Sequence, residues 1–273
     1  MKISTNDMVN IDYDYAKNAI KRFLREELSN TGLSGYVIGL SGGVDSALSY
    51  FLATEAVGSD KVLALIMPDS SVTPKEDIED AKDLVRIKGG QVQIINIDPI
   101  VEVYKSSIPI YEKSDLVPIG NIRARIRMSL LYFYANKLKR LVLGTGDRSE
   151  ITIGYFTKYG DGGADLLPIS NLLKTQVRRL ASMLGIPERV AYKPSSPRLW
   201  ENQLAEKELG VSYETIDLII YGLFDKGLDI EEFTKITGID KSVVERVLEL
   251  NRKTQHKRLQ PASIPFRDVI RYL

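Results

Sequence analysis

The sequence predicts an α/β fold, in which a doubly wound, mostly parallel sheet of five strands carries helices on both faces and leads into a C-terminal helical extension. Short apolar runs rich in β-branched residues alternate with segments of helical period along the first part of the chain. Such runs are typical of parallel strands that are buried on both faces. Their alternation with helices is the order that builds a doubly wound sheet.

Four of the apolar runs are predicted as strands. They are residues 36–40, 62–67, 92–97 and 141–143. Helices are predicted over residues 12–29, 74–88, 122–139 and 172–184, and from about Ala47 onward. Ligands of such sheets bind at the carboxyl ends of the strands. The segments that directly follow strands 36–40 and 141–143 are therefore expected to form the site.

Several helix starts carry side chains with a specific meaning. Thr73 can cap the helix that follows it, with Pro74 in the first position and Glu76 completing a capping box. Ser170 or Asn171 can cap the last predicted helix of the sheet region.

Three arginines, Arg123, Arg125 and Arg127, fall in the first turns predicted for helix 122–139. Positive charges oppose the helix dipole at that end, which costs stability unless an anion binds there. Solvated arginines and an anion site both fit this pattern.

The later part of the chain contains polar connections and more helices. Residues 105–119 and 193–211 are polar, and we expect both to be mobile. Residues 230–250 resemble a helix-turn-helix with Gly238 at the bend, which would suggest a DNA-binding regulator. The second helix mixes basic and acidic residues, which suits phosphates poorly. A packed helical hairpin is the favoured interpretation.

Composition excludes several classes of function. Lys and Arg number 37 against 36 Asp and Glu, so the net charge of +1 does not require nucleic acid or a membrane surface as partner. The absence of cysteine excludes disulfides, thiolate metal sites and Cys nucleophiles. No long apolar run and no signal-like N-terminus is present, so a cytoplasmic protein is expected.

The string GLSGGVDS at residues 39–46 directly follows the first predicted strand. Gly42 and Gly43 lack Cβ atoms, so backbone N–H groups can close around phosphate oxygens, helped by the N-terminus of the next helix. Asp45 is out of place beside phosphates unless a cation lies between them. The string therefore predicts a pyrophosphate-binding loop that uses Mg²⁺. It lacks the lysine of a Walker A loop.

A second dense cluster lies in residues 144–174, where carboxylates and glycines surround short apolar stretches. The glycines at 160, 162 and 163 mark a tight loop to which something approaches closely. Tyr155, Phe156 and Tyr159 lie among them. A stacking platform for a flat ring and a solvated surface loop are both compatible with this composition.

Taken together, these strings resemble the ammonia-dependent NAD synthetases of the N-type ATP pyrophosphatase, or PP-loop, superfamily. The matching strings are GLSGGVDS (39–46), NIRARIRM (121–128), GTGDRSE (144–150), GYFTKYGDGGADLLPI (154–169), ELGVSY (208–213) and HKR (256–258). The resemblance implies a single domain over residues 1–273 with an adenine nucleotide alpha hydrolase-like fold. Residues 1–185 would form the nucleotide-binding core, and residues 186–273 a helical extension with a substrate-contacting tail.

The resemblance also implies a reaction. Deamido-NAD would be amidated to NAD with free ammonia, using ATP and Mg²⁺, in the last step of NAD biosynthesis. The carboxylate attacks the α-phosphorus, pyrophosphate leaves, and ammonia then displaces AMP from the adenylated carboxyl. A homodimer is implied as well, and the predicted helices 12–29 and 122–139 offer amphipathic faces for it. Another PP-loop adenylating, amide-forming ligase is the alternative.

The matching positions imply site residues. The ATP contacts are Gly39, Leu40, Ser41, Gly42, Gly43, Val44, Asp45, Ser46, Thr145, Lys174 and Ser196. The Mg²⁺ ligands are Asp45 and Glu150. The deamido-NAD contacts are Arg125, Lys158, Asp165, Glu208, His256 (the only histidine) and Lys257. The catalytic group is Asp45, Glu150, Lys174 and Asp161. Residues 196–206 depart from the family pattern, with Arg198 in place of an Asp and Asn202 in place of a Gly.

Overall fold

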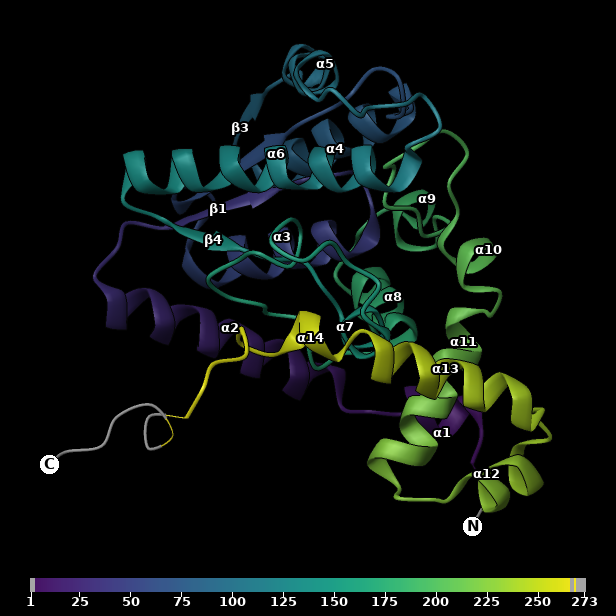
Figure 1. The fold of residues 1–273 in the computed structure, drawn as a ribbon. Helices are drawn as coiled ribbons and strands as arrows, with labels where there is room; N and C mark the ends of the chain where they lie inside the picture. Colours follow the sequence, from purple (N-terminus) through teal and green to yellow (C-terminus); the bar gives the residue numbers. More distant parts are fainter. Residues whose placement is uncertain (1–2, 266–267, 269–273) are drawn as a thin grey trace, which may run out of the picture.

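A parallel sheet of four strands, in the order β3–β2–β1–β4, lies at the centre of the computed structural model, which describes residues 3–265 and 268 (Figure 1). The strands are β1 (Tyr36–Gly39), β2 (Val62–Ile66), β3 (Gln91–Ile94) and β4 (Leu141–Leu143). All four predicted strands are present, although β3 ends three residues early. Tyr36 pairs with Val62 on one side and with Leu141 on the other, so β1 is central.

The expectation of a fifth strand is wrong for the described residues. Beyond β4 the sheet continues only as an isolated bridge between Leu143 and Leu166. The Asp165 carboxylate accepts the N–H of Val142 at 2.7 Å, which is the backbone group that a fifth strand would have to bind. A side chain thus replaces a ladder hydrogen bond and ends the sheet.

Helices cover both faces of the sheet, as a doubly wound fold requires. On one face lie α2 (Tyr13–Thr31), α3 (Val44–Val57), α4 (Lys75–Lys88), α8 (Lys174–Met183) and α9 (Glu188–Ala191). On the other face lie α5 (Asp98–Ser107) and α6 (Leu116–Leu138). Tyr36 and Ile38 pack against the first group, and Val37 packs against the second. The two-residue period of β1 therefore feeds two separate hydrophobic cores.

One strand differs from the prediction in burial. Gln91, Gln93 and Ile94 of β3 are exposed, and half of the Ile94 side chain faces solvent. Because β3 is the edge strand, the run that contains it is not buried on both faces.

Several helix starts differ from the sequence prediction. α3 begins at Val44 rather than near Ala47, which places Asp45 in its first turn. α4 is preceded by Pro74 without a side-chain cap, because the Thr73 hydroxyl instead accepts the N–H of Asp69 at 3.1 Å. α6 begins at Leu116. Its three arginines therefore lie beyond the first turn, and the argument from the helix dipole does not apply to them.

A third hydrophobic core holds the C-terminal helices. It is formed by α10 (Ala205–Leu209), α11 (Tyr213–Ile219), the π-helical turn Ile220–Asp225, α12 (Ile230–Thr237) and α13 (Lys241–Lys253), together with α1 (Thr5–Val9) and α7 (Arg148–Ile153). A 3-10 turn, Ser59–Lys61, and a short helix, α14 (Gln255–Arg258), complete the described elements.

The helix-turn-helix pattern is a packed hairpin. Phe233 of α12 and Val244 and Val247 of α13 are buried in this third core, and Gly238 ends α12 with φ 72°. The two segments expected to be loops contain helix as well. α5 and α6 extend into residues 105–119, and α10 lies within residues 193–211.

Among residues 3–265 and 268, no helix combines the length and the apolar character needed to cross a bilayer.

Candidate active site

A cavity of about 420 Å³ opens where the carboxyl ends of β1, β2 and β4 meet. The chain runs from β1 outward to β3 and then returns to place β4 on the other side of β1. A parallel sheet binds ligands at this kind of switch point. Segments from α6, residues 144–163 and residues 193–200 line the cavity as well.

The loop before α3 is built for close approach by a ligand. Gly42 has φ +78°, and a Cβ there would lie 2.3 Å from the backbone oxygen of Asp77. The Ser46 hydroxyl accepts the N–H of Ser41 at 3.2 Å and donates to the carbonyl of Gly43 at 3.0 Å. These contacts fix the turn that presents the helix N-terminus to the cavity.

Lys174 lies at the centre of an acidic cluster directly below this loop. Its Nζ atom is 2.7 Å from Asp45 Oδ2, 2.8 Å from Glu150 Oε1 and 2.9 Å from Asp147 Oδ2. The Lys174 and Asp147 side chains are fully buried, whereas those of Asp45 and Glu150 are each 21% exposed. Three carboxylates thus surround one ammonium group, and two of them also reach the cavity.

Burial and the neighbouring charges shift pKa values in this cluster. Burial raises the pKa of Asp147, although Lys174 lowers it in part. Burial raises the pKa of Glu150 well above its usual range, and the neighbouring carboxylates raise it further. Burial alone would lower the pKa of Lys174, but the three carboxylates raise it overall. The cluster thus has more acidic groups than its one lysine neutralises.

The donor set fits a divalent cation. One carboxylate oxygen each from Asp45, Asp147 and Glu150 lies within 4.8 Å of the others. Asp45 Oδ1 is buried, and no donor among the described residues bonds to it. Hard cations such as Mg²⁺ prefer carboxylate oxygens. A cation here would supply the positive charge that Lys174 alone does not.

The position of Lys174 depends on a buried network from a distant helix. Neither Ser170 nor Asn171 caps α8, because its first residue is Lys174 and its N-cap is Leu173. Instead, Asp217 of α11 accepts the N–H of Thr175 at 2.8 Å, and the Ser149 hydroxyl accepts the N–H of Lys174 at 2.9 Å.

Ser149 also donates its hydroxyl to Asp217. Asp217 is fully buried. Burial raises the pKa of Asp217, and the Ser149 hydroxyl opposes that shift.

The predicted deamido-NAD contacts are partly brought together. Arg125 donates to the carbonyl of Lys158 at 3.3 Å, and Lys158 Nζ donates to the carbonyl of His256 at 2.7 Å. Lys257 Nζ donates to the carbonyls of Gly154 and Phe156, both at 2.7 Å. α6, the glycine-rich loop and α14 therefore meet in a basic rim. Asp165 lies apart from this rim, where it ends the sheet.

The predicted site residues divide into two groups. Those that line the cavity are Gly39, Leu40, Ser41, Gly43, Val44, Asp45, Ser46, Thr145, Glu150, Asp161, Ser196, Glu208 and Lys257. Those that do not are Gly42, Arg125, Lys158, Asp165, Lys174 and His256. Asp161 accepts the N–H of Thr157 at 2.8 Å and so closes the glycine-rich turn. Glu208 accepts from Tyr155 at 2.8 Å and from Gln203 at 3.0 Å.

Two residues of this region were missed as functional residues. Asp147 completes the acidic cluster, and its place in GTGDRSE beside Glu150 was a signal for it. Arg127 lines the cavity, and its Nε donates to the carbonyl of Met67 at 3.0 Å. Burial lowers the pKa of Arg127 to about 10, so it is charged at neutral pH and can meet an anionic substrate.

The chain is similar to known proteins over nearly its whole length. A family model described as NAD synthase matches residues 16–261. NH(3)-dependent NAD(+) synthetase of Aeropyrum pernix is 56% identical, over 96% of this chain and 92% of its own length. The synthetase of the same name from Hyperthermus butylicus is 52% identical, over 100% of this chain and 98% of its own length.

Solved structures match as well. NMN synthetase from Francisella tularensis is 33% identical with a TM-score of 0.83, over 94% of this chain and 100% of its own. NH3-dependent NAD synthetase from Campylobacter jejuni is 30% identical with a TM-score of 0.79, over 93% of this chain and 100% of its own. The glycine loop, the acidic cluster and the long stretch covered by the family model lead to one conclusion: the chain belongs to the NAD synthase family.

Proposed function

We propose that this enzyme makes NAD from deamido-NAD, ATP and free ammonia, with Mg²⁺, as the last step of NAD biosynthesis. The observation that carries the proposal is the joint opening of the glycine loop and the acidic cluster onto one cavity. The relatives named NH(3)-dependent NAD(+) synthetase support the choice of substrates. Nothing in the proposal needs nucleic acid or a membrane, and we assign the reaction to the cytoplasm.

The reaction has two chemical steps. The nicotinate carboxylate oxygen attacks the α-phosphorus of ATP, and the bond to pyrophosphate breaks. Ammonia nitrogen then attacks the adenylated carbonyl carbon, loses a proton, and AMP leaves with the original carboxylate oxygen. Both steps bring anions together, so the protein's main task is to hold them in place and to screen their charge.

The chain's residues fit these tasks. Backbone N–H groups of residues 39–46 and the start of α3 would bind the ATP phosphates. Asp45 and Glu150 would hold Mg²⁺, which would supply positive charge beside the pyrophosphate. Lys174 keeps both carboxylates in place from below and neutralises part of their charge. Thr145 and Ser196 would contact ATP from the other cavity walls.

The other end of the cavity suits the second substrate. Lys257 lines the cavity, and Arg125, Lys158 and His256 complete the basic rim beside it, which can meet the dinucleotide phosphates. Asp165 lies apart from the rim, beside β4. Asp161 and Glu208 line the wall near Tyr155, where we place the nicotinate ring and ammonia.

A direct assay tests the proposal. The purified chain is incubated with ATP, Mg²⁺, ammonium and deamido-NAD, and we expect NAD, AMP and pyrophosphate in equal amounts. Omitting ATP or ammonium should abolish NAD formation. AMP release without NAD formation, or no reaction at all, would contradict the assignment.

One comparison supports a second candidate substrate. The Francisella tularensis relative is named NMN synthetase, and its structure matches nearly the whole chain. The alternative, another PP-loop adenylating, amide-forming ligase, therefore has a specific form, in which the mononucleotide carboxylate is amidated. Parallel assays with nicotinic acid mononucleotide decide between them, and we expect a higher kcat/KM for deamido-NAD.

We also propose a homodimer. α5 and α6 lie together on the outer side of the sheet (Figure 1) and leave apolar side chains exposed. They are Val103, Tyr104, Val117, Phe133 and Leu138, each 40–63% exposed. Apolar side chains exposed to this degree are typical of surfaces at which subunits associate. α2, the other helix expected to contribute, exposes Tyr15 and Phe23.

A further inference from the structure

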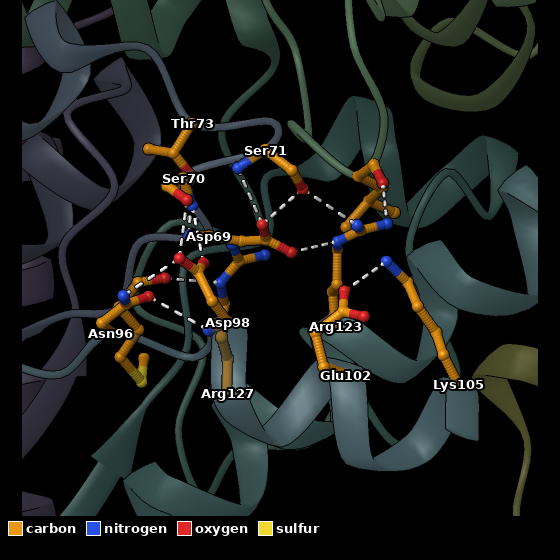
Figure 2. Close-up of polar contacts among 12 residues, drawn as sticks. Asp69, Ser70, Ser71, Thr73, Asn96, Asp98, Glu102, Lys105, Arg123 and Arg127 are labelled. Carbon is orange, nitrogen blue, oxygen red and sulfur yellow. Dashed lines mark hydrogen bonds and ion pairs between the residues drawn. The ribbon is translucent and has the colours of Figure 1, made fainter. Parts of the chain in front are cut away.

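Arg123 joins three segments of the chain from a buried position in α6. Its side chain is 7% exposed, and it does not line the cavity. Its Nε atom donates to Asp69 Oδ2 at 2.6 Å, and one terminal nitrogen donates to the Ser71 hydroxyl at 3.3 Å (Figure 2). The other terminal nitrogen donates to the carbonyl of Leu199 at 2.9 Å. The first two partners lie in the turn after β2, whereas Leu199 lies far along the chain.

Asp69 organises the turn after β2. Its carboxylate, which is 3% exposed, accepts hydrogen bonds from the backbone N–H and the hydroxyl of Ser71. The backbone N–H of Asp69 donates to the Thr73 hydroxyl. Burial alone would raise the pKa of Asp69, but the hydrogen bonds from Ser71 and Arg123 lower it overall. The pair is therefore charged at neutral pH, and Arg123 has a fixed partner that orients its remaining donors.

Residues 196–203 lie against the same helix with little room to move. A Cβ on Gly120 would be 2.9 Å from the Leu199 side chain, so Leu199 packs directly on the α6 backbone. Arg198 Nε donates to Asp77 Oδ2 of α4 at 2.8 Å, and the Leu199 N–H donates to Gln203 at 2.9 Å. Arg198 itself has φ +51°, an unfavourable conformation that these contacts must hold.

The two segments that Arg123 joins both form walls of the cavity. Thr73 and Asp77, which follow β2, line the cavity, and so do Ser196 and Arg198 of the later segment. We propose that Arg123 is a positioning residue for ATP, which holds residues 196–203 over the cavity by binding the Leu199 carbonyl while Asp69 fixes its orientation. The kinetic part of this proposal rests on the proposed function.

The arrangement distinguishes positioning from core packing. If Arg123 served core packing alone, one carboxylate would be enough to neutralise its buried charge, and Asp69 already does so. The bond to Leu199 adds a link to a separate segment, and a lysine in place of Arg123 cannot make both contacts because it lacks the planar fork of donors. Arg123→Lys should therefore keep the charge pair and lose the hold on residues 196–203.

The test compares Arg123→Lys with a matched control. Arg140→Lys also replaces an arginine that donates to a backbone carbonyl, that of Asp60 at 3.2 Å, near the start of β4 and away from the cavity. We expect Arg123→Lys to raise the KM for ATP about tenfold, because the loss of one hydrogen bond to a charged group changes an affinity by about that factor. The KM for deamido-NAD and the values for Arg140→Lys should stay within about twofold of the original.

Trypsin cleavage after Arg198 gives a readout that needs no activity. With residues 196–203 held in place, cleavage at the Arg198–Leu199 bond should be slow, and Arg123→Lys should accelerate it at least about fivefold by freeing the segment. If Arg123→Lys fails to fold, Ser71→Ala removes one acceptor from an exposed side chain and should raise the KM for ATP about two- to threefold.

The outcomes separate cleanly. Unchanged ATP affinity and unchanged cleavage, with only a lower melting temperature, would show that Arg123 is structural and would overturn the proposal. A chain that makes no NAD would overturn the proposed function, and the cleavage rates would then decide on the positioning role alone. Equal changes in Arg140→Lys and Arg123→Lys would also overturn it.

Discussion

Asp45 is the residue at which the glycine loop and the acidic cluster meet. One of its oxygens bonds Lys174, and the other is buried without a donor among the described residues. Asp45→Asn should lower kcat/KM on the order of a hundredfold and raise the Mg²⁺ concentration needed for half-maximal rate, because one of the proposed metal ligands is lost. Titrating Mg²⁺ against rate measures both effects.

The fold should survive this change, because Asp45 lies at the surface of the cavity rather than in a core. Thermal unfolding of Asp45→Asn is the control, and its melting temperature should stay near that of the original chain. An Asp45→Asn variant with the original rate and Mg²⁺ dependence would remove the metal assignment.

Asp217 lies away from the cavity, yet it fixes the start of the helix that carries Lys174. Asp217→Asn should lower the free energy of unfolding by about 1–3 kcal/mol, because the amide presents a donor where Ser149 or Thr175 already donates. Denaturant unfolding measures the change.

Asp225→Asn is the matched control for this variant. Asp225 pairs with Arg148, and both side chains are about 30% exposed. Because exposed ion pairs contribute little, the control should change the free energy of unfolding by less than about 1 kcal/mol. Equal losses in the two variants would contradict the capping role of Asp217.

At the scale of elements, the glycine loop depends on one of its two central glycines more than on the other. Gly42→Ala combines φ +78° with a Cβ 2.3 Å from a backbone oxygen, so the turn has to move. Gly43 has φ −92°, and the nearest atom to a Cβ there is the Ser41 hydroxyl at 3.4 Å. Gly42→Ala should cost at least about 2 kcal/mol of unfolding free energy, and Gly43→Ala less than about 1 kcal/mol.

Denaturant unfolding of the two alanine variants checks this difference. The two changes add the same methyl group to neighbouring positions, so each controls for the other. If both variants unfold at the same denaturant concentration, the close approach of Gly42 to Asp77 does not constrain the loop.

The elements that sequence could predict are those with a local signal. All four strands were found, because apolar β-branched runs bounded by turns mark them in place. Helix ends were less accurate, since α8 is capped by Asp217 and Ser149 from elsewhere in the chain, which no local pattern reveals. The fifth strand is missing for a similar reason, because the Asp165 side chain, which comes from elsewhere in the chain, binds the backbone N–H of Val142 at the edge of the sheet.

The site shows the same division. The glycine loop and Asp45 were readable from a contiguous string. The meeting of Asp45, Asp147, Glu150 and Lys174 depends on how α3, α7 and α8 pack. The family resemblance named Glu150 and Lys174, and Asp147 was missed. Arg123 was noticed for its charge, but its partners in two distant segments could be identified only in the folded chain.

At the scale of the whole molecule, the chain has no cysteine with which to release ammonia from glutamine. Glutamine amide hydrolysis by a thiolate is thus unavailable, and free ammonia should be the direct nitrogen donor. The rate with ammonium should rise with pH as more neutral NH₃ forms, until the protein itself fails. Glutamine free of ammonium should give almost no NAD, and comparable rates with both donors would contradict this expectation.

The proposed dimer makes a second prediction at this scale. Phe133→Lys places a charge in the exposed apolar surface of α5 and α6, so the mass in solution at micromolar concentration should fall from dimer to monomer. Met183→Lys changes an equally exposed side chain on α8 and should leave the mass unchanged. Light scattering after size-exclusion chromatography measures the mass of each variant, and an original chain that is a monomer would contradict the proposed dimer.

The strand order also bears on how the chain is made. On the ribosome, β1, β2 and β3 emerge with their helices well before β4, which must still pass to the open side of β1. Until then the apolar residues of β1 present an unpaired edge, the kind of surface that recruits other nascent chains into aggregates. A chain that stalls before residue 141 should therefore be insoluble, and a chaperone that shields this edge should raise the yield of the full-length protein.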